Sequence, residues 1–289
     1  MLFLIAVVAV ALVAGATASI TGFGIGSLLT PLLAWQLGTQ LAVAAVAVPH
    51  AAGTALRCVR LRRRIDWPVL WRFGLPSAAG GLAGALGQGV LSSLTLTRVL
   101  GGLLVLAGIT GLANLGARLR LRGAWWIFGG LLSGFFGGLV GNQGGIRSAA
   151  LLGISLPPER FVATATASAL IVDAVRLPVY LYHFGEQLPR YGWLLGLAIA
   201  GVLAGTLHGE RILRGMSEDR FRRVVCAFLV VLGLSLIFSG LGARPVGTPS
   251  DASRHAEPSY RLVGGRALEQ THLASGTGSD RLASRGLFR

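Results

Sequence analysis

The sequence predicts an all-α polytopic membrane protein, with about seven or eight transmembrane helices in two duplicated halves. Three observations predict this class: few charged residues, a series of long apolar segments, and an internal repeat. Of the 289 residues, 53% are hydrophobic and only 13% are charged. Soluble domains carry about 25% charged residues. We therefore expect lipid to cover much of the surface.

Eight apolar segments are candidates for membrane crossing, because about 20 apolar residues span a bilayer. They comprise residues 2–20, 41–56, 68–90, 96–116, 124–141, 161–182, 191–209 and 221–240. Two further apolar stretches, 24–37 and 143–156, are too short to span and are bounded by glycine and proline. Such stretches are typical of half-helices or re-entrant segments. We expect the first segment to be a retained helix, since it lacks the basic residues that open a secretory signal.

An internal repeat relates the two halves of the apolar region. Sliding the sequence by 119 residues places Gly22 on Gly141 and Gly26 on Gly145. Each half then contains a helix, a Gly-rich break, a short apolar piece and three more segments. Glycine pairs four residues apart, such as Gly80 with Gly84 and Gly134 with Gly138, also predict close helix packing in lipid.

The repeat divides the chain into three expected regions. A first membrane repeat covers residues 1–117 and a second covers 118–241, each with one Gly-rich broken or re-entrant segment. The remaining residues, 242–289, are rich in arginine, serine and glycine. That composition predicts a disordered tail, because it offers too little apolar surface to offset the entropy of ordering.

The arginine distribution leaves two topologies open. All 26 basic residues are arginine, and those in 57–64 and 118–122 mark cytoplasmic loops by the positive-inside rule. Eight simple crossings then place both termini inside, but put the Arg-rich loop at 211–223 outside. If each Gly-rich break instead folds back, the two repeats are inverted and the tail lies outside.

Matching Gly-rich breaks in two halves are typical of secondary transporters, whose broken segments form the substrate site near the membrane midplane. A half-helix N-terminus presents bare N–H groups and a partial positive charge. Arg147 follows the second break, and a guanidinium suits an oxyanion. We therefore expect a small anionic substrate. The predicted substrate-binding residues are Gly22, Gly24, Gly26, Asn142, Gln143, Gly144, Gly145 and Arg147.

A second set of ionisable residues lies inside predicted membrane segments, where such residues are costly and tend to be functional. Asp173 and Arg176 are three residues apart on one helix and so share a face on which they can pair. His50 fits either a hydrogen-bonded packing residue or a proton carrier. We assign these three residues to coupling or gating, with Asp173 as the expected partner of a proton or sodium ion.

The double Gly-rich pattern resembles the TauE/SafE sulfite exporter family. The resemblance rests on Gly22-Phe23-Gly24-Ile25-Gly26 with Pro31, on Gly141-Asn142-Gln143-Gly144-Gly145, and on Gly80-Gly81 with Gly84. It covers about residues 1–240 and excludes the tail. It implies a multi-pass permease of the cytoplasmic (inner) membrane that exports or takes up sulfite, or organosulfonates such as sulfoacetate. The sequence departs from the family at Arg147, where a neutral residue is expected.

The sequence also admits functions other than transport. A membrane-embedded enzyme would use Ser27 as nucleophile and His50 as base, and a non-transporting scaffold would need neither arginine nor glycine at the breaks. The glycines at 22–26 lack the strand, helix and acidic residue of a dinucleotide site. No metal-ligand spacing is present, and the arginine pattern argues against nucleic acid. The expected partners are therefore lipid and a small anion, without cofactor or metal. The sequence leaves the number of subunits open.

Overall fold

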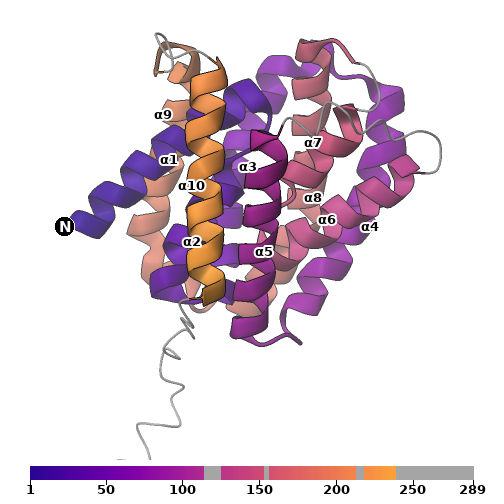
Figure 1. The fold of residues 1–289 in the computed structure, drawn as a ribbon. Coiled ribbons are helices and arrows are strands. Elements are labelled where there is room, and N and C mark those ends of the chain that lie inside the picture. The colour runs from indigo at the N-terminus through magenta and orange to yellow at the C-terminus, as the bar shows by residue number, and fades with distance from the viewer. Residues whose placement is uncertain (114–124, 153–155, 213–217, 239–289) are drawn as a thin grey trace, which may run out of the picture. The chain divides into compact units, whose positions relative to one another are not determined.

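The computed structural model describes residues 1–113, 125–152, 156–212 and 218–238. Within these ranges the chain is almost entirely helical and contains no strand (Figure 1). The predicted link at 118–122, part of the arginine-rich loop at 211–223 and the predicted tail at 242–289 lie outside the described residues.

The described helices follow the predicted segments closely. Ten α-helices are formed: α1 (Leu2–Thr21), α2 (Ile25–Leu37), α3 (Thr39–Leu61), α4 (Trp67–Gln88), α5 (Ser93–Leu112), α6 (Trp125–Val140), α7 (Gly144–Leu152), α8 (Pro158–Phe184), α9 (Gly192–Ile212) and α10 (Glu218–Phe238). Within the described ranges, the short 3-10 helices η1 (Arg62–Arg64) and η3 (Leu188–Tyr191) join some of these α-helices.

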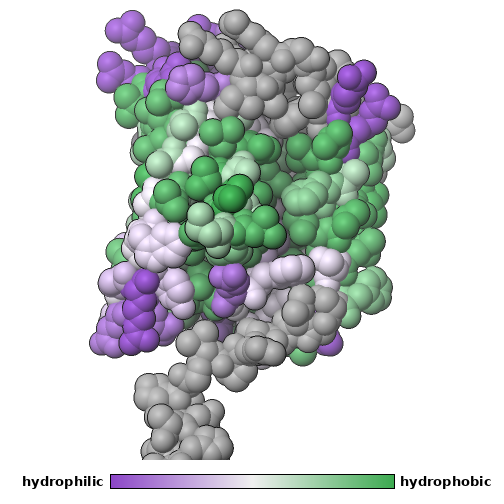
Figure 2. Space-filling model, turned by 90° about the vertical axis from the view of Figure 1, so that its left-hand side faces the viewer, coloured by the Kyte–Doolittle hydropathy of each residue, from purple (hydrophilic) through white to green (hydrophobic). Residues whose placement is uncertain are grey.

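Five helical stretches of the described chain are long and apolar enough to cross a membrane: Leu2–Thr21, Thr39–Arg64, Ser93–Leu112, Pro158–Phe184 and Leu188–Gly209. Three shorter helices, Ile25–Leu37, Trp125–Val140 and Arg223–Phe238, are also apolar. Large hydrophobic side chains are exposed on several helices, for example Trp71, Leu106 and Phe128. One face of the molecule shows a hydrophobic band with hydrophilic groups above and below it (Figure 2). These features define a multi-pass membrane protein.

Both Gly-rich stretches interrupt a helix at the predicted positions. Helix α1 ends at Gly22, which has the left-handed φ of 79° that glycine adopts without a Cβ clash. Helix α6 ends before Gly141, whose φ is 73°. The next helices, α2 and α7, begin three residues beyond each glycine and have 13 and 9 residues. Both ends and both restarts are 119 residues apart in the sequence.

Glycines bring three helix pairs into direct backbone contact: α4 with α6, α1 with α9, and α5 with α10. On α4 and α6 the contact involves the two predicted pairs, Gly80 with Gly84 and Gly134 with Gly138. A Cβ on any of these four glycines would overlap a carbonyl oxygen of the facing helix. The expected close packing through small residues is therefore present at this interface.

Replacing Gly138 by alanine is expected to destabilise the protein by about 1–3 kcal/mol, the usual cost of overpacking. The added methyl would overlap the carbonyl oxygen of Gly81 and lie 2.6 Å from the backbone nitrogen of Ala85, so α4 must move. Gly102→Ala is the matched control, because nothing lies within 4 Å of its added Cβ. Thermal unfolding of the purified variants measures the difference. Equal stability of both variants would contradict the packing argument.

Candidate functional site

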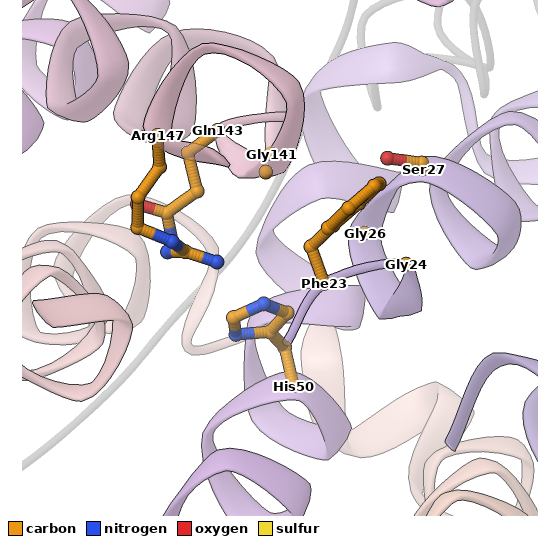
Figure 3. Close-up of a pocket in the computed structure, with 9 residues that line it drawn as sticks. Phe23, Gly24, Gly26, Ser27, His50, Gly141, Gln143 and Arg147 are labelled. Carbon is orange, nitrogen blue, oxygen red and sulfur yellow. The ribbon is translucent and has the colours of Figure 1, made fainter. Parts of the chain in front are cut away.

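The two breaks meet around a small cavity of about 10 Å³, room for about one water molecule. It is lined by Phe23, Gly24, Gly26, Ser27, His50, Gly141, Gln143, Gly144 and Arg147. Figure 3 shows Arg147 and Gln143 on one side of this space, Phe23 and Ser27 on the other, and His50 from a third direction. The cavity therefore joins α2, α3 and α7, which are far apart in the sequence.

Glycine allows the two breaks to touch. A Cβ at Gly26, in the first turn of α2, would overlap the carbonyl oxygen of Gly141. A Cβ at Gly144, the first residue of α7, would overlap the side chain of Phe23. The N-termini of both helices thus face one cavity. Because the first N–H groups of a helix have no partner within it, the two ends together present donors and partial positive charge.

Arg147 brings a full positive charge to this cavity. Its side chain is only 2% exposed, and its Nη2 donates to the carbonyl oxygen of Gly22 at 3.3 Å. Within the described part of the chain, Nε and Nη1 have no hydrogen-bond partner. A buried, incompletely paired guanidinium is costly. A ligand with acceptor oxygens would satisfy these donors.

The amide side chains beside Arg147 differ in their partners. Asn142 accepts a hydrogen bond from Ser27 Oγ at 3.0 Å, which ties the second break to α2. Its Nδ2 is buried and has no partner among the described residues. Gln143 lines the cavity with both side-chain polar atoms buried and equally unpartnered there. A buried polar atom without a hydrogen-bond partner carries a desolvation cost. A polar ligand that pairs with these amide atoms would offset that cost.

His50, Asp173 and Arg176 form one connected cluster. Nδ1 of His50 is 2.7 Å from Oδ2 of Asp173, and Nε of Arg176 donates to Oδ1 at 2.9 Å. Arg176 also donates from Nη1 to the carbonyl oxygen of Gly137 at 2.5 Å, on the helix that precedes the second break. The expected pair of Asp173 with Arg176 is therefore formed. His50 connects this pair to the cavity wall.

The structure separates the predicted substrate-binding residues into three groups. Gly24, Gly26, Gln143, Gly144 and Arg147 line the cavity. Gly22 and Asn142 lie behind that lining, where they hydrogen-bond to Arg147 and Ser27. Gly145 is not in the lining, and a Cβ there would meet Ala107 of α5 at 3.3 Å. Four lining residues were absent from the predicted substrate-binding set: Phe23, Ser27, Gly141 and His50, which was assigned to coupling or gating.

Arg57 is a correction to the sequence interpretation, which placed it in a cytoplasmic loop. Helix α3 continues to Leu61, and Arg57 is buried within it at 4% exposure. Its Nη2 donates to Thr54 Oγ1 at 3.3 Å. The spacing of His50, Thr54 and Arg57 by four and three residues was the signal available in the sequence, because it places all three on one helix face.

The geometry gives the enzyme alternative no nucleophile–base pair. Ser27 Oγ donates to Asn142, while His50 Nδ1 faces Asp173 and Thr54. Among the described residues no hydrogen bond joins Ser27 to His50. The activation of a serine that such an enzyme requires is therefore not seen.

Apolar helices, two helix breaks and a buried arginine at a polar cavity are together typical of a membrane transport protein. The family model described as "Sulfite exporter TauE/SafE" matches residues 7–236, so the chain belongs to this family of membrane transporters. No curated protein and no solved structure matches the chain.

Proposed function

We propose that the chain is a secondary transporter for a small oxyanion, of the sulfite or organosulfonate kind, in the cytoplasmic (inner) membrane. The observation that carries this proposal is Arg147, a buried guanidinium at a cavity between two helix N-termini, with two nitrogens that no described residue pairs. The guanidinium and both helix N-termini attract negative charge. The family description, which names sulfite, points to the same class of solute.

The substrate-binding residues of this proposal are those around the two breaks: Gly22, Gly24, Gly26, Asn142, Gln143, Gly144, Gly145 and Arg147. The lining glycines allow backbone to approach the solute, and the two side-chain amides supply further donors. A cavity of about 10 Å³ is too small for an oxyanion of four or more heavy atoms. Binding and release therefore require the two breaks to move apart.

The two proposed membrane repeats, 1–117 and 118–241, provide a means of that movement. Their breaks lie 119 residues apart in the sequence, and the contacts of the helices are consistent with duplication. Under the 119-residue shift the α4–α6 contact corresponds to the α9–α1 contact, and α5 with α10 corresponds to itself. Relative motion of two such repeats about a central site is the usual form of alternating access.

We assign coupling to His50, Asp173 and Arg176. His50 has one ring nitrogen against Asp173 and lines the cavity. Protonation of His50 would thus place a positive charge beside both the carboxylate and the bound anion. This charge links protonation to solute binding. Histidine suits this role because its imidazole ring can bind and release one proton while keeping a contact to the carboxylate.

Flux into proteoliposomes tests the proposed function. Reconstituted full-length protein is expected to move sulfite and small sulfonates faster than carboxylates of similar size, and empty liposomes give the background. An imposed pH gradient is expected to change the flux, whereas an imposed sodium gradient is not. Absence of anion flux above background would reject transport of this class. A response to sodium alone would reject the assignment of a proton to the cluster.

A further inference from the structure

Arg57 is a second buried guanidinium that the fold itself does not fully pair. In the described part of the chain, Nη2 alone has a hydrogen-bond partner, Thr54 Oγ1 on the same helix. Nε and Nη1 are buried and have no partner among the described residues. Burial of a cation in this state is costly. A role in packing alone would not require a charge here.

The side chain of Arg57 extends back along α3 toward the cavity. Thr54 lies between Arg57 and His50 on the helix, about one turn from each. Its Oγ1 is 3.4 Å from Nδ1 of His50, which lines the cavity. Because Arg57 reaches back to Thr54, its guanidinium lies on the face of α3 that carries His50. Arg147 lines the same cavity as His50, so the contacts from Arg57 through Thr54 to His50 connect Arg57 to the wall of the cavity that holds Arg147.

The charges buried in the described part of the chain do not balance. They comprise Arg57, Arg147, Arg176 and Asp173. Asp173 pairs with Arg176 and so compensates one of the three arginines. With His50 neutral, two positive charges remain without a counter-charge. A solute with one negative charge would leave one arginine uncompensated in the interior.

We infer that the solute binds as a dianion held between Arg147 and Arg57, with Arg57 as a second substrate-binding arginine. This inference rests on the proposed function and adds the charge of the solute to it. The class is a small oxyanion with two negative charges, which would supply acceptor oxygens for the unpartnered nitrogens of both guanidinium groups. Neither arginine alone explains the excess of charge.

Sulfate and methanesulfonate are suitable probes, because both are small and tetrahedral but differ by one charge. Their dissociation constants follow from the thermal stabilisation of the purified full-length protein on titration. The wild type is expected to bind sulfate roughly tenfold or more tightly than methanesulfonate, the ratio that one additional charge-assisted contact supplies. Arg57→Gln is expected to remove most of this ratio by weakening sulfate. Arg57→Lys is expected to keep part of it.

Arg60→Gln is the matched control, since Arg60 is exposed on the same helix and is expected to keep the wild-type ratio. Arg57→Gln should also be no less stable than the wild type without anion, because it removes an incompletely paired buried charge. Equal binding of both probes by the wild type, or an unchanged ratio in Arg57→Gln, would overturn the inference while leaving anion transport intact. Stabilisation by neither probe would count against the anion site as a whole.

Discussion

Replacing Asp173 by asparagine is expected to destabilise the protein by about 3–5 kcal/mol, the cost of removing one partner from a buried ion pair. Asp173 is fully buried, and both of its carboxylate oxygens are in use. Oδ1 accepts from Arg176 and Oδ2 lies 2.7 Å from His50. Asparagine keeps the shape but removes the charge. Arg176 would then become a third buried arginine without a counter-charge.

The free energy of unfolding of the purified variants measures this effect. The control is the double variant Asp173→Asn/Arg176→Met, in which the unpaired charge is removed together with its partner. We expect it to recover part of the lost stability, so that the double-mutant cycle gives a coupling of more than about 1 kcal/mol. A single Asp173→Asn variant as stable as the wild type would show that the carboxylate is not needed to compensate Arg176.

Replacing Arg147 by glutamine is expected to lower anion affinity on the order of a hundredfold, equivalent to about 3 kcal/mol of lost charge-assisted hydrogen bonding. Two nitrogens of Arg147, Nε and Nη1, are buried at the cavity and find no hydrogen-bond partner among the residues that the structure describes. Glutamine retains a donor and most of the stem, so the change is mainly one of charge. The affinity is measured from the concentration dependence of sulfite flux in proteoliposomes.

Two further variants separate binding from folding. Arg147→Lys keeps the charge but loses the planar fork that binds two oxygens at once, so we expect it to retain part of the affinity. Arg98→Gln changes an exposed arginine on α5 and is expected to behave as the wild type. If Arg147→Gln transports with unchanged affinity, the solute is not bound at this guanidinium.

Several elements of the site could be predicted because they depend on local sequence. The breaks at Gly22 and Gly141 follow from glycine between apolar runs, since left-handed backbone is accessible to glycine without strain. The pair of Asp173 with Arg176 follows from their spacing of three residues on one helix. Arg147 stood out because an arginine beside Gly-rich sequence in an apolar region is costly.

Other elements depended on where helices end and which faces they bury. The second candidate segment, 41–56, was expected to stop at residue 56, because the arginines beyond it indicated a loop. Helix α3 instead continues to Leu61 and packs against α2, α8 and α9, and Arg57 is buried within it. Likewise, Ser27 and Asn142 are 115 residues apart, and no local pattern indicates that they hydrogen-bond.

The sequence by itself determined that this protein is helical, lies in a membrane and has two Gly-rich helix breaks. These properties follow from composition and short-range spacing, which act within single segments. Only the tertiary structure decided that both breaks meet at one cavity, that His50 lies 2.7 Å from Asp173, and that Arg57 is buried beside them. Such contacts depend on the packing of helices distant in the chain, because the face that each helix buries is set by its neighbours.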